Sequence, residues 1–147
     1  MSHYVATHND EGLSVISQKI PTGPHSHDMP IGSMDIIYST HTFPADISSE
    51  SDIDQYAHDR THGIENGFCP PGGIAAAILQ FEPHAISPMH RTMTMDIMVV
   101  MEGIVELHLD GGEVRTLKAG DSIVQRGTMH MWKNVTPNNG LVKAIGQ

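Results

Sequence analysis

The sequence predicts an all-β fold, because short apolar segments with a two-residue period follow one another through its second half. In the segment IVELHLD, Val105, Leu107 and Leu109 alternate with more polar positions, which is the pattern of a strand that is buried on one face. Glycine and proline separate these segments, and no long helical segment lies between them. Many short strands in such a series are typical of an antiparallel sandwich or barrel.

The same signals place the individual elements. We expect a strand over residues 34–39 (MDIIYS) and a short helix that begins near Ser49 or Ser51, where serines precede an acidic stretch. Further strands are expected at residues 74–82, 94–102, 104–110, 114–125, 129–134 and 141–145. The remainder of the first half is rich in proline, glycine and serine, which favours irregular structure.

The chain changes character near Pro70. The polar residues 1–69 are expected to form an N-terminal extension that packs on a barrel, and residues 70–147 are expected to form the barrel core. A chain of 147 residues is long enough to bury one core without disulfides or metals.

Composition limits the partners. The formal net charge of -9, from 17 acidic and 8 basic residues, argues against nucleic acid and against an anionic membrane surface, so a small-molecule substrate is the expected partner. Cys69 is the only cysteine, which rules out an intrachain disulfide. We find no signal-peptide pattern and no apolar run near the ~20 residues that span a bilayer. These features favour a cytoplasmic protein.

Residues 89–96 (MHRTMTMD) place polar side chains in a segment that otherwise has the pattern of a strand. If the strand is unbroken, one of its faces carries His90, Thr92, Thr94 and Asp96. In a closed barrel such a face would line a cavity. His130, on a second strand and on the same face of it as Trp132, could reach the same cavity. Two imidazoles and a carboxylate suit Fe(II), Mn(II) or Zn(II), although a solvated surface strand is the alternative.

The stretches HRTMTMDIMVVMEG and GDSIVQRGTMHMWKN resemble the two motifs of the cupin superfamily, G(X)5HXH(X)3-4E(X)6G and G(X)5PXG(X)2H(X)3N. The residues that carry the resemblance are His90, Asp96 in the place of glutamate, Gly103, Gly120, Gly127, His130 and Asn134. The match covers roughly residues 73–145. It implies a cupin double-stranded β-helix, a jelly-roll barrel, here with an N-terminal extension that contains the short helix.

Two departures from the motifs bear on chemistry. Thr92 stands where the second histidine is expected, and Gln125 stands where proline is usual. Threonine is a poor ligand for these metals compared with imidazole, so the site either holds Zn, Fe or Mn weakly or works as a metal-free acid–base site. The HRT segment is also similar to small fungal cupins, some from gene clusters for secondary metabolites. That similarity implies dehydration, decarboxylation or cyclisation of polyketide-type compounds.

Three functions follow as hypotheses. The first is a lyase or isomerase in which His90, Asp96 and His130 are catalytic, with Asp96 orienting and charge-balancing an imidazole. The second is a metal-dependent dioxygenase in which the same three residues hold Fe(II). The third is a ligand-binding protein without catalysis.

Four residues are candidates for substrate binding: Thr92, Thr94, Arg126 and Trp132. Arg126 could bind a carboxylate or form a structural salt bridge, and Trp132 could stack on a planar substrate at the cavity mouth or pack against the barrel end. We also expect a homodimer, in which the strand at residues 34–39 extends a neighbour's sheet. His58 and His62 are expected to be solvated surface histidines, and Cys69 a packed apolar residue.

Overall fold

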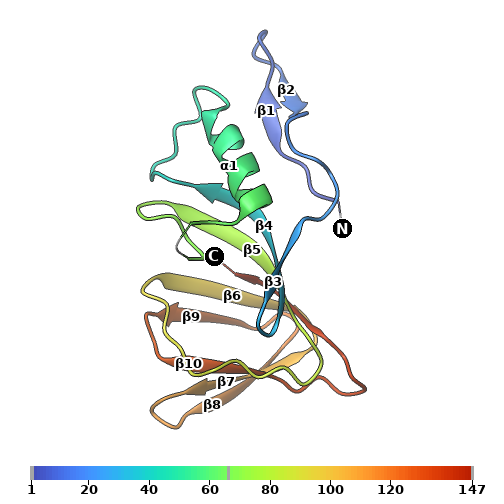
Figure 1. Cartoon of the computed structure of the whole chain (residues 1–147), viewed down its shortest axis with the longest axis vertical. Helices are drawn as coiled ribbons and strands as arrows, with labels where there is room; N and C mark the ends of the chain where they lie inside the picture. Colours follow the sequence, from blue (N-terminus) through green and yellow to red (C-terminus); the bar gives the residue numbers. More distant parts are fainter. Residues whose placement is uncertain (1, 66, 147) are drawn as a thin grey trace. The chain divides into compact units, whose positions relative to one another are not determined.

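The computed structural model describes residues 2–65 and 67–146, and this part of the chain forms eleven strands and one helix (Figure 1). The elements in chain order are β1 (Ala6–His8), β2 (Ser14–Ile16), β3 (Ser26–Met29), β4 (Gly32–Thr40), α1 (Ser51–His62), β5 (Ile74–Phe81), β6 (Met95–Glu102), β7 (Ile104–Leu109), β8 (Val114–Lys118), β9 (Ser122–Arg126), β10 (His130–Asn134) and β11 (Val142–Gly146). Among these described residues, no helix has the length and apolar character that crossing a membrane requires.

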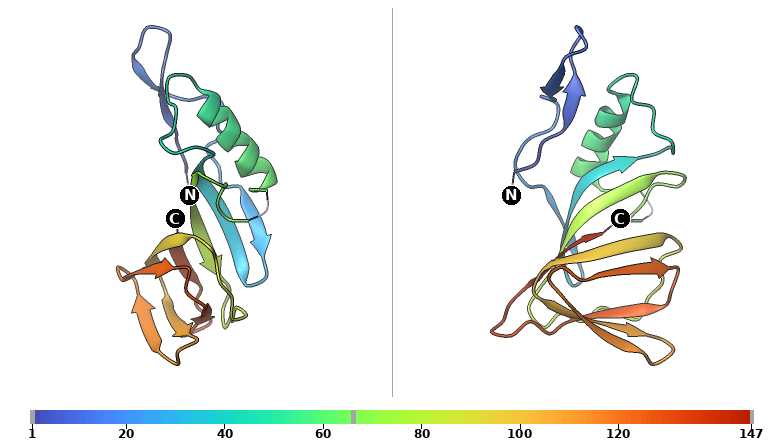
Figure 2. Two further views of the ribbon diagram at one scale, coloured as in Figure 1. Left: turned by 90° about the vertical axis from the view of Figure 1, so that its left-hand side faces the viewer. Right: turned by 180° about the vertical axis from the view of Figure 1, so that it is seen from behind.

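The strands form three sheets (Figure 2). The largest has the order β3-β4-β5-β11-β6-β9, the second has the order β10-β7-β8, and β1 pairs with β2 alone. The registers of β11 with β5 and β6, and of β7 with β8 and β10, are antiparallel. This is the all-β jelly-roll barrel, with a helix in the N-terminal part, that the sequence predicts.

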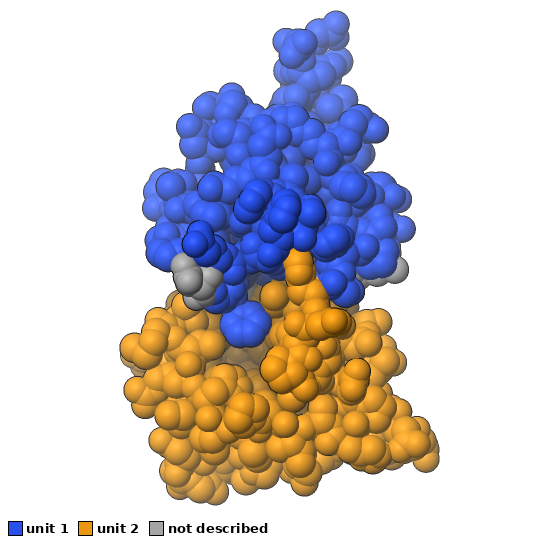
Figure 3. All heavy atoms as spheres, in the orientation of Figure 1, with its two compact units in different colours: residues 1–26, 35–76 blue, residues 27–34, 77–147 orange. Residues whose placement is uncertain are grey.

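The chain divides into two compact units (Figure 3). The first comprises residues 1–26 and 35–76, and the second comprises residues 27–34 and 77–147. Strands β4 and β5 therefore each contribute residues to both units. The division of the chain at residue 70 into an extension and a barrel core stays a prediction.

Apolar side chains from both larger sheets build the core of the second unit. The buried cluster consists of Phe81, Met98, Val100, Val105, Leu107, Trp132, Val142 and Ala144. On β7 the buried residues are the alternating ones that the two-residue period predicts, since Val105 and Leu107 are at most 2% exposed. Burial of these side chains is the main force that holds the two sheets face to face.

In the first unit, helix α1 begins at Ser51, as expected. Asp52 and Asp54 lie in its first turn, where negative charge is favourable to the helix dipole, and Gly63 ends the helix with a φ of 84°. Tyr56 is fully buried, donates a hydrogen bond to the Ile36 carbonyl and contacts the His3 ring. The helix is thereby attached to two segments that precede it in this unit, β4 and the N-terminal residues around His3.

Three expectations about elements were wrong. The strand predicted through residues 89–96 is interrupted, because β6 begins only at Met95. The first half of the chain is more regular than expected, since β1, β2 and β3 lie in it. The segment expected as one strand over residues 114–125 is two strands, β8 and β9. The strand predicted at residues 34–39 exists as β4, between β3 and β5, and its pairing with a neighbour's sheet stays a prediction. The homodimer itself stays a prediction that light scattering tests.

Candidate active site

Two histidines from different parts of the second unit meet across an isolated antiparallel bridge. The His90 amide donates to the His130 carbonyl, and the His130 amide donates to the His90 carbonyl, both at 2.8 Å. Because side chains directly opposite in an antiparallel bridge project to the same side, the imidazoles come together with ring centroids 4.3 Å apart. The sequence prediction that His90 and His130 converge is therefore seen in the geometry.

Backbone carbonyls orient both rings. His90 Nδ1 lies 2.9 Å from the Pro88 carbonyl oxygen, and His130 Nδ1 lies 2.9 Å from that of Thr128. A carbonyl oxygen can only accept, so Nδ1 carries the proton in each neutral ring and Nε2 carries the lone pair. In the described part of the chain, no protein group forms a hydrogen bond with either Nε2. Each Nε2 is thus available as a base or as a ligand.

Burial shapes the chemistry of His130. The residue is 3% exposed, and its ring meets Trp132 edge-on with centroids 5.7 Å apart. Removal from water lowers the pKa of His130 below its ordinary value, the Thr128 carbonyl raises it, the nearby charge of His90 lowers it, and the charge of Asp96 raises it. The net direction is downward. At neutral pH, His130 is therefore an uncharged base.

Asp96 is held by two threonines. Thr92 Oγ1 donates to Asp96 Oδ2 at 2.5 Å, and Thr94 Oγ1 donates to Asp96 Oδ1 at 2.6 Å. The expected contact, in which the carboxylate orients an imidazole, does not occur, because the rings are oriented by backbone carbonyls instead. Asp96 influences His130 only through its charge.

The predicted metal ligands do not fit a metal centre. Over residues 2–65 and 67–146, no group of three or more histidine, cysteine, aspartate or glutamate side chains is arranged to hold a metal ion. Thr92 supplies a hydroxyl where an imidazole would bind, and both carboxylate oxygens of Asp96 are engaged by hydroxyl groups. Zn, Fe and Mn bind imidazole far better than a threonine hydroxyl, so this donor set disagrees with the predicted site at His90, Asp96 and His130.

The candidate substrate-binding residues fall into two groups. Thr92 and Thr94 contact Asp96 and so lie at the site. Arg126 pairs with Met95, one residue away from the Asp96–Gln125 pair, and successive residues of a strand point to opposite faces, so Arg126 faces the outside of the barrel. It also forms none of the ion pairs found among the described residues. Trp132 is 6% exposed and packs in the core near Phe81, not at a cavity mouth.

Gln125 and Thr128 are site residues that sequence reasoning missed. Gln125 is directly opposite Asp96 in the β6–β9 pair and is 5% exposed. The Thr128 hydroxyl donates to Gln125 Oε1 at 3.0 Å, while the Thr128 carbonyl accepts from His130. The one available signal was that Gln125 replaces a motif proline, because a polar side chain at an inward strand position needs a partner.

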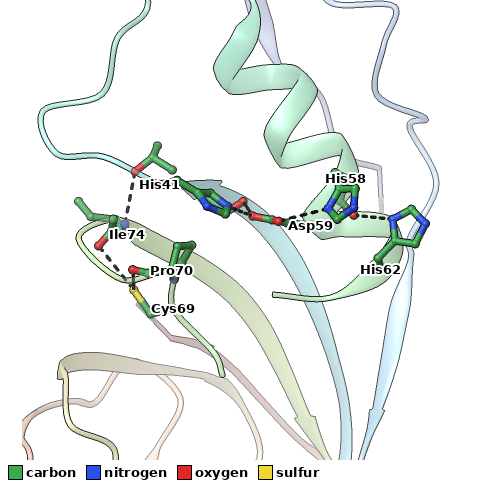
Figure 4. Close-up of polar contacts among 10 residues, drawn as sticks. His41, His58, Asp59, His62, Cys69, Pro70 and Ile74 are labelled. Atoms are coloured by element: carbon green, nitrogen blue, oxygen red, sulfur yellow. Dashed lines mark hydrogen bonds and ion pairs between the residues drawn. The ribbon is translucent and has the colours of Figure 1, made fainter. Parts of the chain in front are cut away.

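The remaining histidines considered from the sequence lie in the first unit (Figure 4). His58 is 68% exposed at its side chain, and its ring stacks on that of His62 with centroids 4.5 Å apart. His58 also lies 3.7 Å from Asp59, a buried carboxylate that is bonded to Ser39 and His41. The Cys69 thiol contacts the Pro70 and Gly73 carbonyls. The contacts of Asp59 connect α1 to Ser39 and His41, and those of Cys69 lie within the loop before β5.

The second unit thus combines antiparallel barrel strands with two neighbouring imidazoles that backbone carbonyls orient. Residues 77–142 match the cupin domain family. Oryzines biosynthesis cluster protein J of Aspergillus oryzae is 36% identical over 133 residues, which are 89% of this chain and 73% of that protein. The chain therefore belongs to the cupin family.

Two further relatives extend the comparison. Phomopsin biosynthesis cluster protein D of Diaporthe leptostromiformis is 38% identical, over 90% of this chain and 70% of that protein. The cupin-domain-containing oxidoreductase fogC of Aspergillus ruber is 35% identical, over 94% of this chain and 66% of that protein. Among solved structures, a Salmonella typhimurium protein assigned to ethanolamine utilization (protein Q) shares the fold, with a TM-score of 0.50 and 17% identity over 99% of this chain and 93% of that one.

Proposed function

We propose that this protein is an enzyme of secondary metabolism that removes water from a hydroxy-carbonyl compound by acid–base catalysis. The observation that carries the proposal is the paired presentation of two Nε2 atoms, from His90 and His130, by rings whose Nδ1 atoms are bonded to backbone carbonyls, so that a neutral ring can accept a proton and a protonated ring can give one. Such a pair can move one proton onto the protein and another off it. The names of two relatives as biosynthesis cluster proteins support the metabolic setting.

In this mechanism His130 is the base. Its Nε2 takes a proton from the carbon next to the substrate carbonyl, and the electron pair of the broken C–H bond forms the C=C bond of an enolate while the carbonyl π pair moves onto oxygen. Return of a solvent-exchanged proton to the enolate brings deuterium to that carbon. In the forward direction the carbonyl reforms and the C=C bond shifts to the following carbon. The hydroxyl group on the following carbon leaves with its bonding electrons. His90, in its imidazolium form, gives that hydroxyl a proton, and water departs. Exchange with solvent then restores both rings.

Asp96 acts at a distance in this proposal. Its negative charge favours the protonated form of His130, so it stabilises the imidazolium that forms as the C–H bond breaks. The hydroxyls of Thr92 and Thr94 fix the position of that charge. Asp96 itself exchanges no proton with the substrate.

A second candidate is an oxidoreductase, which the name of the Aspergillus ruber relative favours. A third is binding of a small molecule without turnover. The three candidates differ in what they consume and release, since only dehydration produces a conjugated enone and water without uptake of oxygen.

The test uses 4-hydroxy-2-butanone, the smallest convenient β-hydroxy ketone. We expect the protein to form the conjugated enone in proportion to its concentration, with deuterium from D2O entering the carbon next to the carbonyl. Ultraviolet absorbance and proton NMR measure the two events. Oxygen uptake without enone would favour the oxidoreductase, and neither enone formation nor deuterium incorporation would overturn the dehydratase proposal.

A further inference from the structure

The side-chain amide of Gln125 has a hydrogen-bond partner within the protein at its oxygen but not at its nitrogen. Its Oε1 accepts a hydrogen bond from Thr128 Oγ1 at 3.0 Å. No residue in the described part of the chain accepts a hydrogen bond from its Nε2, which carries two N–H donors. The side chain is nevertheless 5% exposed. A donor that the protein leaves without an acceptor, on a residue that is otherwise buried, commonly marks a place that a ligand or water fills.

This donor atom keeps contact with solvent, although most of the residue is buried. Every fully buried side-chain nitrogen or oxygen in the described residues has a hydrogen-bond partner. Since Nε2 of Gln125 has none, it is not fully buried. The register of β6 with β9 puts Gln125 directly opposite Asp96, and therefore on the inner face.

The same inner face carries the catalytic pair of the proposed mechanism. Thr128 connects the two groups, because its hydroxyl holds Gln125 and its carbonyl holds the ring of His130. The amide and the imidazole are thus positioned by one residue. A molecule that accepts from Nε2 of Gln125 would lie beside the base.

Charge limits what that molecule is. The cations of strands β6, β9 and β10 are Arg126 and Lys133, and both belong to outer faces: Arg126 pairs with Met95, and Lys133 forms an ion pair with Glu106 on the far side of the sheet from Trp132. The inner face instead holds the carboxylate of Asp96. A substrate carboxylate would meet that negative charge, while the imidazolium of His90 is engaged by the leaving hydroxyl group in the proposed mechanism and Arg91, in the loop after His90, is exposed.

We infer that Gln125 is the residue that binds the substrate's carbonyl oxygen, and that the substrate is a neutral ketone or aldehyde and not a carboxylate. This inference rests on the proposed function. The amide donates to the carbonyl oxygen in the ground state and to the enolate oxygen that forms when His130 removes the neighbouring proton. A donor aimed at a developing negative charge stabilises the transition state more than the substrate.

The binding test follows the side-chain amide of Gln125 by 15N-resolved NMR, with assignment from its absence in Gln125→Met. The probes are 4-hydroxy-2-butanone and its anionic counterpart, 3-hydroxybutanoate. We expect saturable shifts of this amide signal with the neutral probe and none with the anion. Saturable shifts with the anion, or no shift with the neutral probe, would overturn the inference.

The variants give a second measurement. Gln125→Glu keeps the shape and removes the donor, and Gln125→Met removes the donor without adding charge. Each should weaken binding of 4-hydroxy-2-butanone by about tenfold, the usual value of one hydrogen bond. Gln80→Glu is the matched control, because Gln80 lies on the opposite face of β5 from the buried Phe81. Unchanged binding in a folded Gln125→Met protein would remove Gln125 from the site.

Failure of this inference can be told apart from failure of the proposed function. Deuterium incorporation that depends on His130 but not on Gln125 would keep the acid–base mechanism and reject the amide contact. Saturable binding that depends on Gln125, without deuterium incorporation, would keep the amide contact and reject the dehydratase.

Discussion

The hydroxyl of Thr92 donates to Asp96 Oδ2 at 2.5 Å, at the position where the cupin motif has an imidazole. One residue thus removes a metal donor and also engages the carboxylate that would be another. The relationship explains why His90, Asp96 and His130 do not form a metal-binding group, although the sequence spacing suggests one.

Thr92→His should therefore create metal affinity. The new imidazole would add a donor, and Asp96 would lose one of its hydroxyl partners. We expect Zn²⁺ to bind at least about tenfold more tightly than to the unaltered protein, a change typical of alterations around metal sites. Isothermal titration calorimetry measures it. Ser122→His, which adds a histidine to the exposed end of β9, is the control. Equal, tight Zn²⁺ binding by the unaltered protein would contradict this explanation.

His130→Gln should abolish most of the activity. Glutamine retains polarity and much of the volume of the side chain but cannot take a proton, and general acid–base groups contribute roughly a hundred- to ten-thousand-fold in rate. Enone formation from 4-hydroxy-2-butanone measures the loss, and circular dichroism checks the fold. His62→Ala alters an exposed histidine of α1 and should keep full activity. A loss of less than about threefold, under ~1 kcal/mol, would make His130 a structural residue.

Activity should decline on the acidic side of neutrality. Burial lowers the pKa of His130 below 6.5, so the ring stays neutral to a lower pH than an ordinary histidine. The acidic limb of the kcat/KM profile should therefore have its midpoint below 6.5, and the residual activity of His130→Gln should lack that limb. A midpoint above 6.5 would contradict the assignment of His130 as the base.

The same titration affects stability with a definite sign. In the unfolded chain a histidine binds its proton near pH 6.5, whereas folded His130 binds it only at lower pH. The free energy of unfolding is therefore not reduced by this titration above pH 6.5, and it decreases as the pH falls from 6.5 through the pKa of the folded protein. Urea unfolding at a series of pH values should show this loss, and His130→Gln should reduce it.

Much of the barrel could be predicted from residue pattern alone. Val105 and Leu107 followed the two-residue period into the core, and His90 and His130 were correctly expected to meet. The segment before Met95 could not be predicted, because its structure depends on where its partner strand ends. The last β6–β9 pair joins Met95 to Arg126, and Gly127 then turns with a φ of 62°. Beyond that turn, residues 91–94 have no ladder to join.

The hydrogen bonds between polar side chains at the site also could not be predicted from the pattern of apolar and polar residues. Threonine hydroxyls compete with strand pairing by bonding nearby groups, and Thr92 and Thr94 do so with Asp96. The two-residue period predicted that Thr92, Thr94 and Asp96 share one face of a continuous strand. The three side chains do lie together, but Thr92 and Thr94 precede β6 and are not in a strand. The role of Gln125 depends likewise on Thr128, three residues away in a turn.

Asn134, a matched residue of the second motif, should prove structural. It is 2% exposed, and its Nδ2 donates to the carbonyls of Glu82 at 2.8 Å and Gly140 at 3.0 Å. Its Oδ1 accepts from the Thr136 amide at 2.9 Å. Asn134→Ala would remove these bonds and leave buried backbone groups without partners, which should lower the free energy of unfolding by about 2–4 kcal/mol. Urea denaturation measures the change.

The control for this prediction is Asn139→Gly. Asn139 is exposed, its backbone φ of 56° is one that glycine adopts without strain, and its side chain bonds only the exposed His84 ring. Its replacement should cost less than about 1 kcal/mol. Both variants should keep the deuterium-incorporation activity per folded molecule, since neither residue reaches His90 or His130. If Asn134→Ala remained as stable as the control but lost activity, Asn134 would belong to the site and not to the scaffold.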